Sequence, residues 1–204
     1  MKIIRTDFDR FQDYGCLINP RIIYFGSERH DEEKGEEEQG VEYASAKKVI
    51  KNLIFLDTLN HKQITLYLNN PGGCSFNGMA IYDVIKKIKS PVKAIGIGQV
   101  MSMTSIIIQA CRYRFLTENT TFMIHDGNLS VDSDSKSALN WAKWEEKFRK
   151  KMYKIYYTKM KKKNRKITLQ QVEDLCSHDT ILSAFQAVGF GLADKIIGSK
   201  DGLR

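Results

Sequence analysis

The chain has 204 residues, 42% of them hydrophobic and 27% charged, which is enough to bury the core of one globular domain. Its formal charge of +8 comes without any motif that reads nucleic-acid bases, so we expect no nucleic-acid partner. No apolar run approaches the roughly 20 residues of a membrane-spanning helix, and the acidic residues in "MKIIRTDFDRF" disfavour a signal peptide.

The charged residues, the absence of a phosphate-binding motif and the cysteines indicate further which ligands and which location to expect. The basic excess lies in residues 143–166, where a solvated helix face explains the lysines better than a polyanion-binding patch does. No phosphate-binding G-x-x-x-x-G-K-[ST] pattern occurs, so we expect neither ATP hydrolysis by that route nor a cofactor. The cysteines lack metal-ligand spacing, which predicts reduced thiols, no metal site and a cytoplasmic location. They are Cys16, Cys74, Cys111 and Cys176.

The first half of the chain alternates strand and helix patterns. "RIIYFG" at 21–26 predicts a strand, and an acidic loop at 31–40 follows as a surface insertion too charged to bury. Apolar residues at helical spacing predict a helix over 41–58. A strand at 63–69 ends in the turn "NNPGG", and a helix over 75–89 carries lysines on its outer side. Such alternation predicts βαβ units with right-handed crossovers.

The same alternation continues past the middle of the chain. A third strand, "VKAIGIG", begins after Pro91, and an apolar helix follows Ser102 and runs to about residue 110. Short strands are predicted around 113–117 and 121–125. These segments extend the predicted sheet.

The pattern changes in the last third of the chain. A long, highly charged helix with several aromatic residues is predicted over 133–160, and it either projects from the domain or packs on a partner. Capping-box patterns that start at Thr168 and Ser183 predict two short helices, with the loop "CSHD" between them.

The junction "GIGQVMSMTS" places a lone hydroxyl, Ser102, between a strand and the apolar helix. One interpretation is a helix N-cap, where serine is a preferred residue. The other is a nucleophile, which needs a base, an acid that orients the base, and donors for an oxyanion. The nearest approach to a G-x-S-x-G elbow, "GCSFN", has Asn77 in its last position, which disfavours Ser75 as the nucleophile.

His125 is the best-placed candidate base. It ends the apolar strand "TFMIH", which delivers its ring to a loop edge, although a structural histidine explains the position as well. His30 adjoins the acidic loop and His61 a turn, so both are expected at the surface. The backbone N–H groups of Gly73, in "NNPGG", and of Met103, at the helix start, are candidate oxyanion donors, with an ordinary Pro-Gly turn as the alternative for the first.

Taken in order, these motifs resemble those of the ClpP family, the proteolytic subunits of Clp proteases. The resemblance covers residues 17–198 and is carried by "RIIYFG", "LYLNNPGGCSFNGMAIYDVI", "IGQVMSM", "FMIHDG" and "SHDTILSAFQAVGFGLADKI". It implies that Ser102 is the nucleophile, His125 the general base and Asp179 the acid that orients it. Asp126 is a rival acid, but neighbours on an extended chain point to opposite faces, which favours Asp179.

The resemblance also implies an architecture and partners. It implies an α/β, ClpP/crotonase-type fold of stacked βαβ units with a protruding long "handle" helix. It further implies two stacked heptameric rings that enclose the sites, polypeptide substrates and a separate hexameric Clp ATPase. The implied parts are an N-terminal segment with an axial loop over 1–20, a head over 21–132 with the insertion 31–40, the handle helix over 133–160, and a C-terminal part of the head over 161–204 that contains the acid of the triad.

Several positions depart from the family's usual motifs. Asn70 stands where SPGG has serine, and Thr104 and Ser105 stand where Gly-Ala is usual. Asp126 and Gly127 replace the usual Gln-Pro after the histidine. All of these departures lie within a few residues of a candidate site residue, so they affect the local geometry of the candidate site.

The leading hypothesis is a ClpP-type serine endopeptidase that degrades polypeptides or peptides inside a ring-shaped barrel. A ClpP-like maturation protease, for example for viral capsid processing, would keep the fold but work without an ATPase. A non-catalytic ring subunit, or a crotonase-like acyl-CoA binder with "NPGG" as its oxyanion hole, belongs to a different class. The set of Ser102, His125 and Asp179 disfavours both of these.

Overall fold

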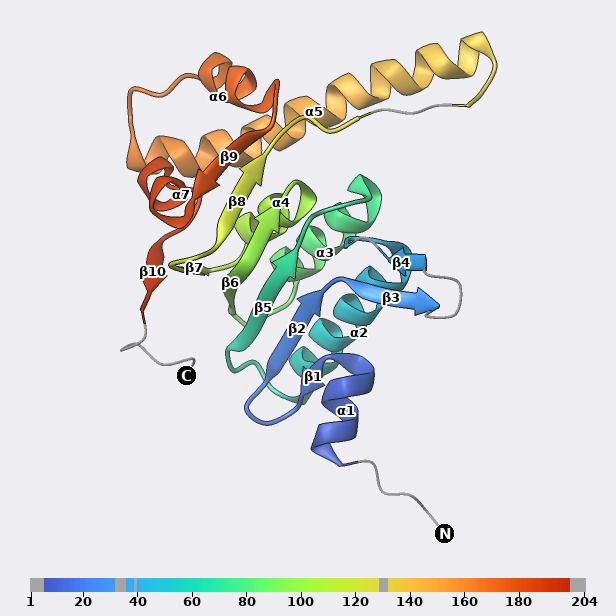
Figure 1. Ribbon diagram of the computed structural model, residues 1–204, viewed down its shortest axis with the longest axis vertical. Coiled ribbons are helices and arrows are strands. Elements are labelled where there is room, and N and C mark those ends of the chain that lie inside the picture. Colours follow the sequence, from blue (N-terminus) through green and yellow to red (C-terminus); the bar gives the residue numbers. More distant parts are fainter. Residues whose placement is uncertain (1–5, 32–35, 39, 129–131, 199–204) are drawn as a thin grey trace.

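A computed structural model of the chain describes residues 6–31, 36–38, 40–128 and 132–198. Within these residues an eight-stranded sheet forms the centre of the molecule, and helices pack along it (Figure 1). Most neighbouring strands of the sheet are parallel and are joined by helices. The predicted α/β class with βαβ units is therefore confirmed.

The main sheet is built from strands that are far apart in sequence. Its members are β1 (Cys16–Leu17), β2 (Ile22–Gly26), β5 (Ile64–Asn70), β6 (Val92–Met101), β7 (Tyr113–Thr117), β8 (Thr121–Ile124), β9 (Thr180–Ser183) and β10 (Lys195–Ile197). The order is β1-β2-β5-β6-β7-β10, while β8 pairs with the far end of β6 and β9 pairs with β8. Only β1 with β2 and β8 with β9 are antiparallel among these described pairs.

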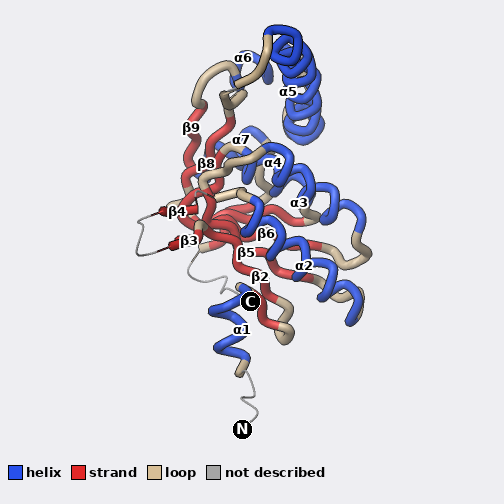
Figure 2. Tube along the Cα trace, turned by 90° about the vertical axis from the view of Figure 1, so that its right-hand side faces the viewer, coloured by secondary structure: helices blue, strands red, loops and turns tan. Residues whose placement is uncertain are grey.

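The helices of the described residues are α1 (Asp7–Tyr14), α2 (Tyr43–Leu59), α3 (Ser75–Lys87), α4 (Met103–Ala110), α5 (Ser135–Lys163), α6 (Leu169–Cys176) and α7 (Ala184–Phe190). α2, α3 and α4 lie side by side against the same face of the sheet (Figure 2). The capping boxes predicted at Thr168 and Ser183 are present at the starts of α6 and α7. None of these helices in the described ranges combines the length and the apolar character that crossing a membrane requires.

The core lies between the sheet and these helices. In β5 the buried positions alternate, with Ile64, Leu66 and Leu68 fully inaccessible, as expected for a strand with one face on the core. α4 is buried from Met103 to Gln109, which is consistent with its run of three isoleucines, and its polar side chains there are hydrogen-bonded. The chain is thus held rigidly where β6 ends and α4 begins.

The long helix α5 is longer at its C-terminus than the predicted range, because it runs to Lys163. Its first half extends beyond the sheet, whereas its second half packs on the head (Figure 1). Among the described positions of α5, buried residues occur only from Phe148 onward. They are Phe148, Met152, Tyr153, Tyr156 and Met160.

Part of the acidic insertion is not the loop that its composition predicts. Strands β3 (Glu28–Asp31) and β4 (Glu36–Glu38) form an antiparallel pair there. Hairpin hydrogen bonds join backbone groups, so a charged sequence can form them when it stays at the surface. The rest of the insertion, at 32–35 and 39, lies outside the described residues, as do 1–5 of the predicted axial loop.

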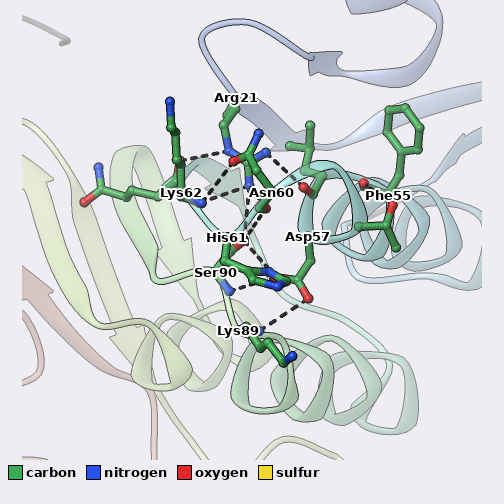
Figure 3. Close-up of polar contacts among 11 residues, drawn as sticks. Arg21, Phe55, Asp57, Asn60, His61, Lys62, Lys89 and Ser90 are labelled. Carbon is green, nitrogen blue, oxygen red and sulfur yellow. Dashed lines mark hydrogen bonds and ion pairs between the residues drawn. The ribbon is translucent and has the colours of Figure 1, made fainter.

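A buried arginine organises the amino ends of the parallel strands (Figure 3). Arg21 is 7% exposed, and its guanidinium donates to Ser90 Oγ at 3.1 Å. It also donates to four main-chain carbonyl oxygens at 2.9 to 3.3 Å, those of Leu56, Asn60, Lys62 and Gln63. One side chain thus satisfies the carbonyl groups at the end of α2 and in the turn before β5.

Asp57 continues this network on the neighbouring side. Its Oδ1 accepts from the hydroxyl and the backbone N–H of Ser90, both at 2.8 Å, and lies 3.2 Å from His61 Nδ1. Burial alone would raise the pKa of Asp57, but hydrogen bonds from Ser90, His61 and Lys89 outweigh it and lower the pKa to about 2. The carboxylate therefore has a structural role at this end of the sheet.

Candidate active site

Ser102 lies where β6 turns into α4, at the carboxyl end of a central parallel strand. Its φ of 49° and ψ of −125° are values that residues other than glycine rarely adopt. Ser102 is the N-cap residue of α4, as the first interpretation predicts, but its side chain makes no capping hydrogen bond to the helix. A strained serine held in this way at the end of a strand favours a functional hydroxyl.

Two strand pairings bring the three predicted side chains together. β6 pairs with β8 in parallel, and the Ser102 N–H donates to the carbonyl of Met123 at 2.9 Å. β8 pairs with β9 in antiparallel register with Ile124 opposite Thr180, so the next residues, His125 and Asp179, also face each other. The site thus forms at one edge of the sheet from segments far apart along the chain.

The hydrogen bonds of His125 define its orientation. Its Nε2 is 2.8 Å from Ser102 Oγ, and its Nδ1 is 2.8 Å from Asp179 Oδ1. A carboxylate can only accept, so Nδ1 carries the proton, and Nε2 of the neutral ring accepts from the serine hydroxyl. This tautomer leaves Nε2 able to take a proton from Ser102.

Asp126 has a different set of partners. Its Oδ1 accepts from the Tyr153 hydroxyl of α5 at 2.6 Å, its Oδ2 lies 4.0 Å from Arg149, and its N–H donates to the carbonyl of Cys176 at 2.8 Å. Burial and this hydrogen bond to Asp126 both raise the pKa of Tyr153, so the phenol remains a donor. Asp126 therefore joins the loop after His125 to α5, and Asp179 is the acid beside the imidazole.

The first glycine of "NNPGG", Gly72, allows a close approach to Ser102. A Cβ at Gly72 would lie 2.5 Å from the Cβ of Ser102 and 3.0 Å from the N of Met103. The carbonyl of Gly72 accepts from the N–H of Val41 at 2.7 Å. Because C=O and N–H of a trans peptide point in opposite directions, this bond turns the N–H of Gly73 away from Val41.

Asn70 is a supporting residue that motif reading does not single out. It is fully buried, and its Oδ1 accepts from the N–H of Gly72 at 2.9 Å and from Thr104 Oγ1 at 2.8 Å. Thr104 follows Met103, so Asn70 ties the glycine turn to the start of α4. Asn70 and Thr104 both depart from the family's usual motifs, and these two departures were the signal in the sequence that could have identified Asn70 as a supporting residue.

A cavity of about 390 Å³ opens beside these groups. Gly73, Ser102, Met103 and His125 line it, together with an aromatic wall from α3 and α5. In that wall the ring of Trp144 stacks between Phe76, at 4.9 Å between centroids, and Phe148, at 5.0 Å. The cavity offers an apolar surface to a substrate side chain. Among the described residues no cluster of His, Cys, Asp and Glu could hold a metal ion.

The similarity of this chain to known proteins extends over most of its length. The model of the Clp protease family matches residues 10–200. The chain is 31% identical over 187 residues to the ATP-dependent Clp protease proteolytic subunit of Deinococcus radiodurans, which covers 90% of this chain and 83% of that protein. It is 37% identical over 120 residues to a protein of the same name from Carsonella ruddii, which covers 57% of this chain and 56% of that protein. The family match extends from α1 past β10, so it includes every residue of the site.

Proposed function

Because the chain belongs to the Clp protease family, we propose that it is a serine endopeptidase of the ClpP type that cleaves unfolded polypeptides or peptides. The observation that supports this function is the in-line arrangement of three side chains. Ser102 Oγ and Asp179 Oδ1 each lie 2.8 Å from opposite nitrogens of His125. A proton relay from a nucleophile to a base requires this connection through the imidazole.

The reaction begins with attack of Ser102 Oγ on the scissile carbonyl carbon, while His125 Nε2 takes the hydroxyl proton. Asp179 holds the ring through Nδ1–H and stabilises the imidazolium that forms. His125 then gives the proton to the leaving amine, which leaves an acyl group on Ser102. A water molecule, deprotonated by the same imidazole, releases the acyl group and restores the serine.

The backbone N–H groups of Gly73 and Met103 stabilise the negative charge on the carbonyl oxygen. Both residues line the cavity beside Ser102, and Met103 is the first residue of α4, where main-chain N–H groups lack helical partners. The aromatic wall around Trp144 receives an apolar side chain of the substrate next to the bond that is cut.

The proposal extends to the assembly. Two heptameric rings stack into a barrel through α5, whose projecting first half exposes the large apolar side chains of Leu139 and Trp141. Polypeptides reach the enclosed sites with the help of a separate hexameric Clp ATPase, in a cytoplasmic location. The relative from Deinococcus radiodurans is named as a subunit of an ATP-dependent protease, which supports this division of work.

A fluorophosphonate probe together with a fluorogenic peptide tests the chemistry. We expect the probe to label Ser102 and the peptide to be cleaved, and Ser102→Ala to lose both, with kcat lower by roughly 10⁶. Ser75→Ala is the matched control, because this serine lines the same cavity but should leave the label on Ser102. Folded, assembled wild-type protein that the probe does not label would contradict the proposal.

A second experiment tests the assembly and the partner. Native mass measurement should give a particle of fourteen subunits, as two heptameric rings require. A Clp ATPase with ATP should then be needed for degradation of a folded protein but not of the short peptide. Degradation of folded protein without any ATPase would favour the maturation-type alternative.

A further inference from the structure

A buried pair of hydroxyl groups connects the long helix α5 with the turn that holds Ser102. The phenol oxygen of Tyr156 lies 2.6 Å from Ser105 Oγ, and Ser105 Oγ lies 2.6 Å from the carbonyl oxygen of Ser102. Ser105 is fully buried and Tyr156 is 2% exposed. Both distances are within the range of hydroxyl hydrogen bonds, so the connection is continuous.

The direction of the two hydrogen bonds follows from the atoms involved. A carbonyl oxygen can only accept, so the Ser105 hydroxyl donates its one hydrogen to Ser102. The Tyr156 hydroxyl must then be the donor to Ser105 Oγ. Burial raises the pKa of Tyr156 well above its ordinary value, so the phenol keeps the proton that it donates. Because hydrogen bonds in a chain polarise one another, Tyr156 strengthens the bond that Ser105 makes.

The carbonyl that receives this chain belongs to the same peptide unit as the N–H of Met103. In a planar trans peptide the two groups point in opposite directions, so whatever holds the Ser102 carbonyl also directs the Met103 N–H. The backbone N–H of Ser105 donates to the same carbonyl at 2.9 Å, so Ser105 holds it with two donors. Met103 lines the cavity, as do Ser102 and Tyr156.

The connection is a feature of this chain and does not come with its family resemblance. Ser105 stands where an alanine is usual, and alanine has no hydroxyl to join α5 to the turn. The peptide unit that carries the Gly73 N–H is oriented by a different hydrogen bond, in which the N–H of Val41 donates to the carbonyl of Gly72. Each candidate oxyanion donor thus has its own support.

We propose that Ser105 and Tyr156 are positioning residues through which helix α5 directs the Met103 N–H toward the oxyanion. This inference rests on the proposed serine peptidase function, in which Met103 supplies one of the two donors. The carbonyl oxygen of the substrate gains its negative charge only in the transition state, so the effect falls on kcat and not on KM.

Two variants that each remove one hydroxyl test the inference in the full-length protein. Removal of a whole oxyanion donor lowers kcat by roughly 10²–10³, and misdirection of a donor loses part of that. We therefore expect kcat to fall about 10-fold in Ser105→Ala and about 3-fold in Tyr156→Phe, with KM unchanged and fluorophosphonate labelling slowed in parallel. Tyr157→Phe removes a phenol hydroxyl from the next position of α5 and should leave kcat unchanged.

The double variant separates positioning from a general loosening of the fold. Because Tyr156 acts through Ser105, adding Tyr156→Phe to Ser105→Ala should leave kcat at the value of Ser105→Ala alone. Wild-type kcat in both single variants, a change confined to KM, or a further loss in the double variant would overturn the inference. Wild-type protein that neither cleaves peptide nor takes the label would overturn the proposed function, and this inference with it.

Discussion

The described residues include two groups of a serine, a histidine and an aspartate, one at each end of the parallel strands. At the carboxyl end the imidazole of His125 is the middle member, 2.8 Å from Ser102 Oγ and 2.8 Å from Asp179 Oδ1. The serine hydroxyl donates to a ring nitrogen and faces a cavity of about 390 Å³. A substrate can therefore reach a hydroxyl that has a base beside it.

At the amino end the carboxylate of Asp57 is the middle member (Figure 3). Its Oδ1 accepts from Ser90 Oγ at 2.8 Å and lies 3.2 Å from His61 Nδ1. Ser90 is buried and also receives a hydrogen bond from Arg21. Its hydroxyl thus donates to a weakly basic carboxylate within a network whose polar groups are already paired.

The comparison teaches that the residue types alone do not determine the chemistry. A carboxylate with a pKa of about 2 cannot take a proton from a serine near neutral pH, whereas a neutral imidazole can. At the amino end the polar groups saturate one another and hold the sheet together. At the carboxyl end the imidazole has an oriented, accessible partner, which is what a reaction needs.

The largest expected effect tests this contrast through the two histidines. His125→Ala should lower kcat by roughly 10⁶, because the serine loses its base, while the free energy of unfolding changes little. His61→Ala removes a ring that is bonded to an aspartate in the same way, yet it should leave kcat unchanged. Kinetics on a fluorogenic peptide measure both, and a comparable loss of kcat in His61→Ala would break the distinction.

Loss of the arginine at the amino end should act on stability and not on the reaction. Arg21→Met keeps much of the side-chain volume but leaves the buried carbonyl of Leu56 and three partly buried carbonyl groups without this donor, so we expect a loss of about 3 kcal/mol in the free energy of unfolding. Urea denaturation measures it, with kcat per folded molecule as the second readout. Arg10→Met, at an exposed arginine 3.9 Å from Asp7, is the control and should change stability by less than about 0.5 kcal/mol.

The smallest effect concerns the pH dependence of stability. The pKa of Asp57 is about 2 in the folded protein and ordinarily 3.8, so on acidification the unfolded chain binds the proton first and unfolding is favoured. The stabilisation is complete above about pH 5 and is lost as pH falls toward 2, with a size of up to about 2 kcal/mol.

Asp57→Asn isolates this contribution from those of other carboxylates. The difference in free energy of unfolding between wild type and Asp57→Asn should narrow as pH falls from about 5 to about 2, when both are measured by urea denaturation. A difference that stays constant over this range would mean that the Asp57 carboxylate adds no pH-dependent stability.

Much of the fold was predictable because it depends on residues that are close in sequence. The alternation in β5, the helical spacing in α2 and the capping boxes at Thr168 and Ser183 each require only a few neighbouring positions. The strand β9 was not predictable in this way, because four residues carry little pattern and its pairing partner β8 is distant in the chain. The β3–β4 hairpin was missed because its charged composition is typical of a loop.

By itself the sequence determined the local settings: a serine between a strand and an apolar helix, a histidine at a strand end, and two glycines that let the backbone approach. Only the tertiary structure decided that Ser102, His125 and Asp179 meet, and that Tyr156 of α5 reaches the turn through Ser105. The reason is physical. Strand register and helix packing join segments that are tens of residues apart, and the backbone hydrogen bonds and burial that fix them leave no local pattern to read.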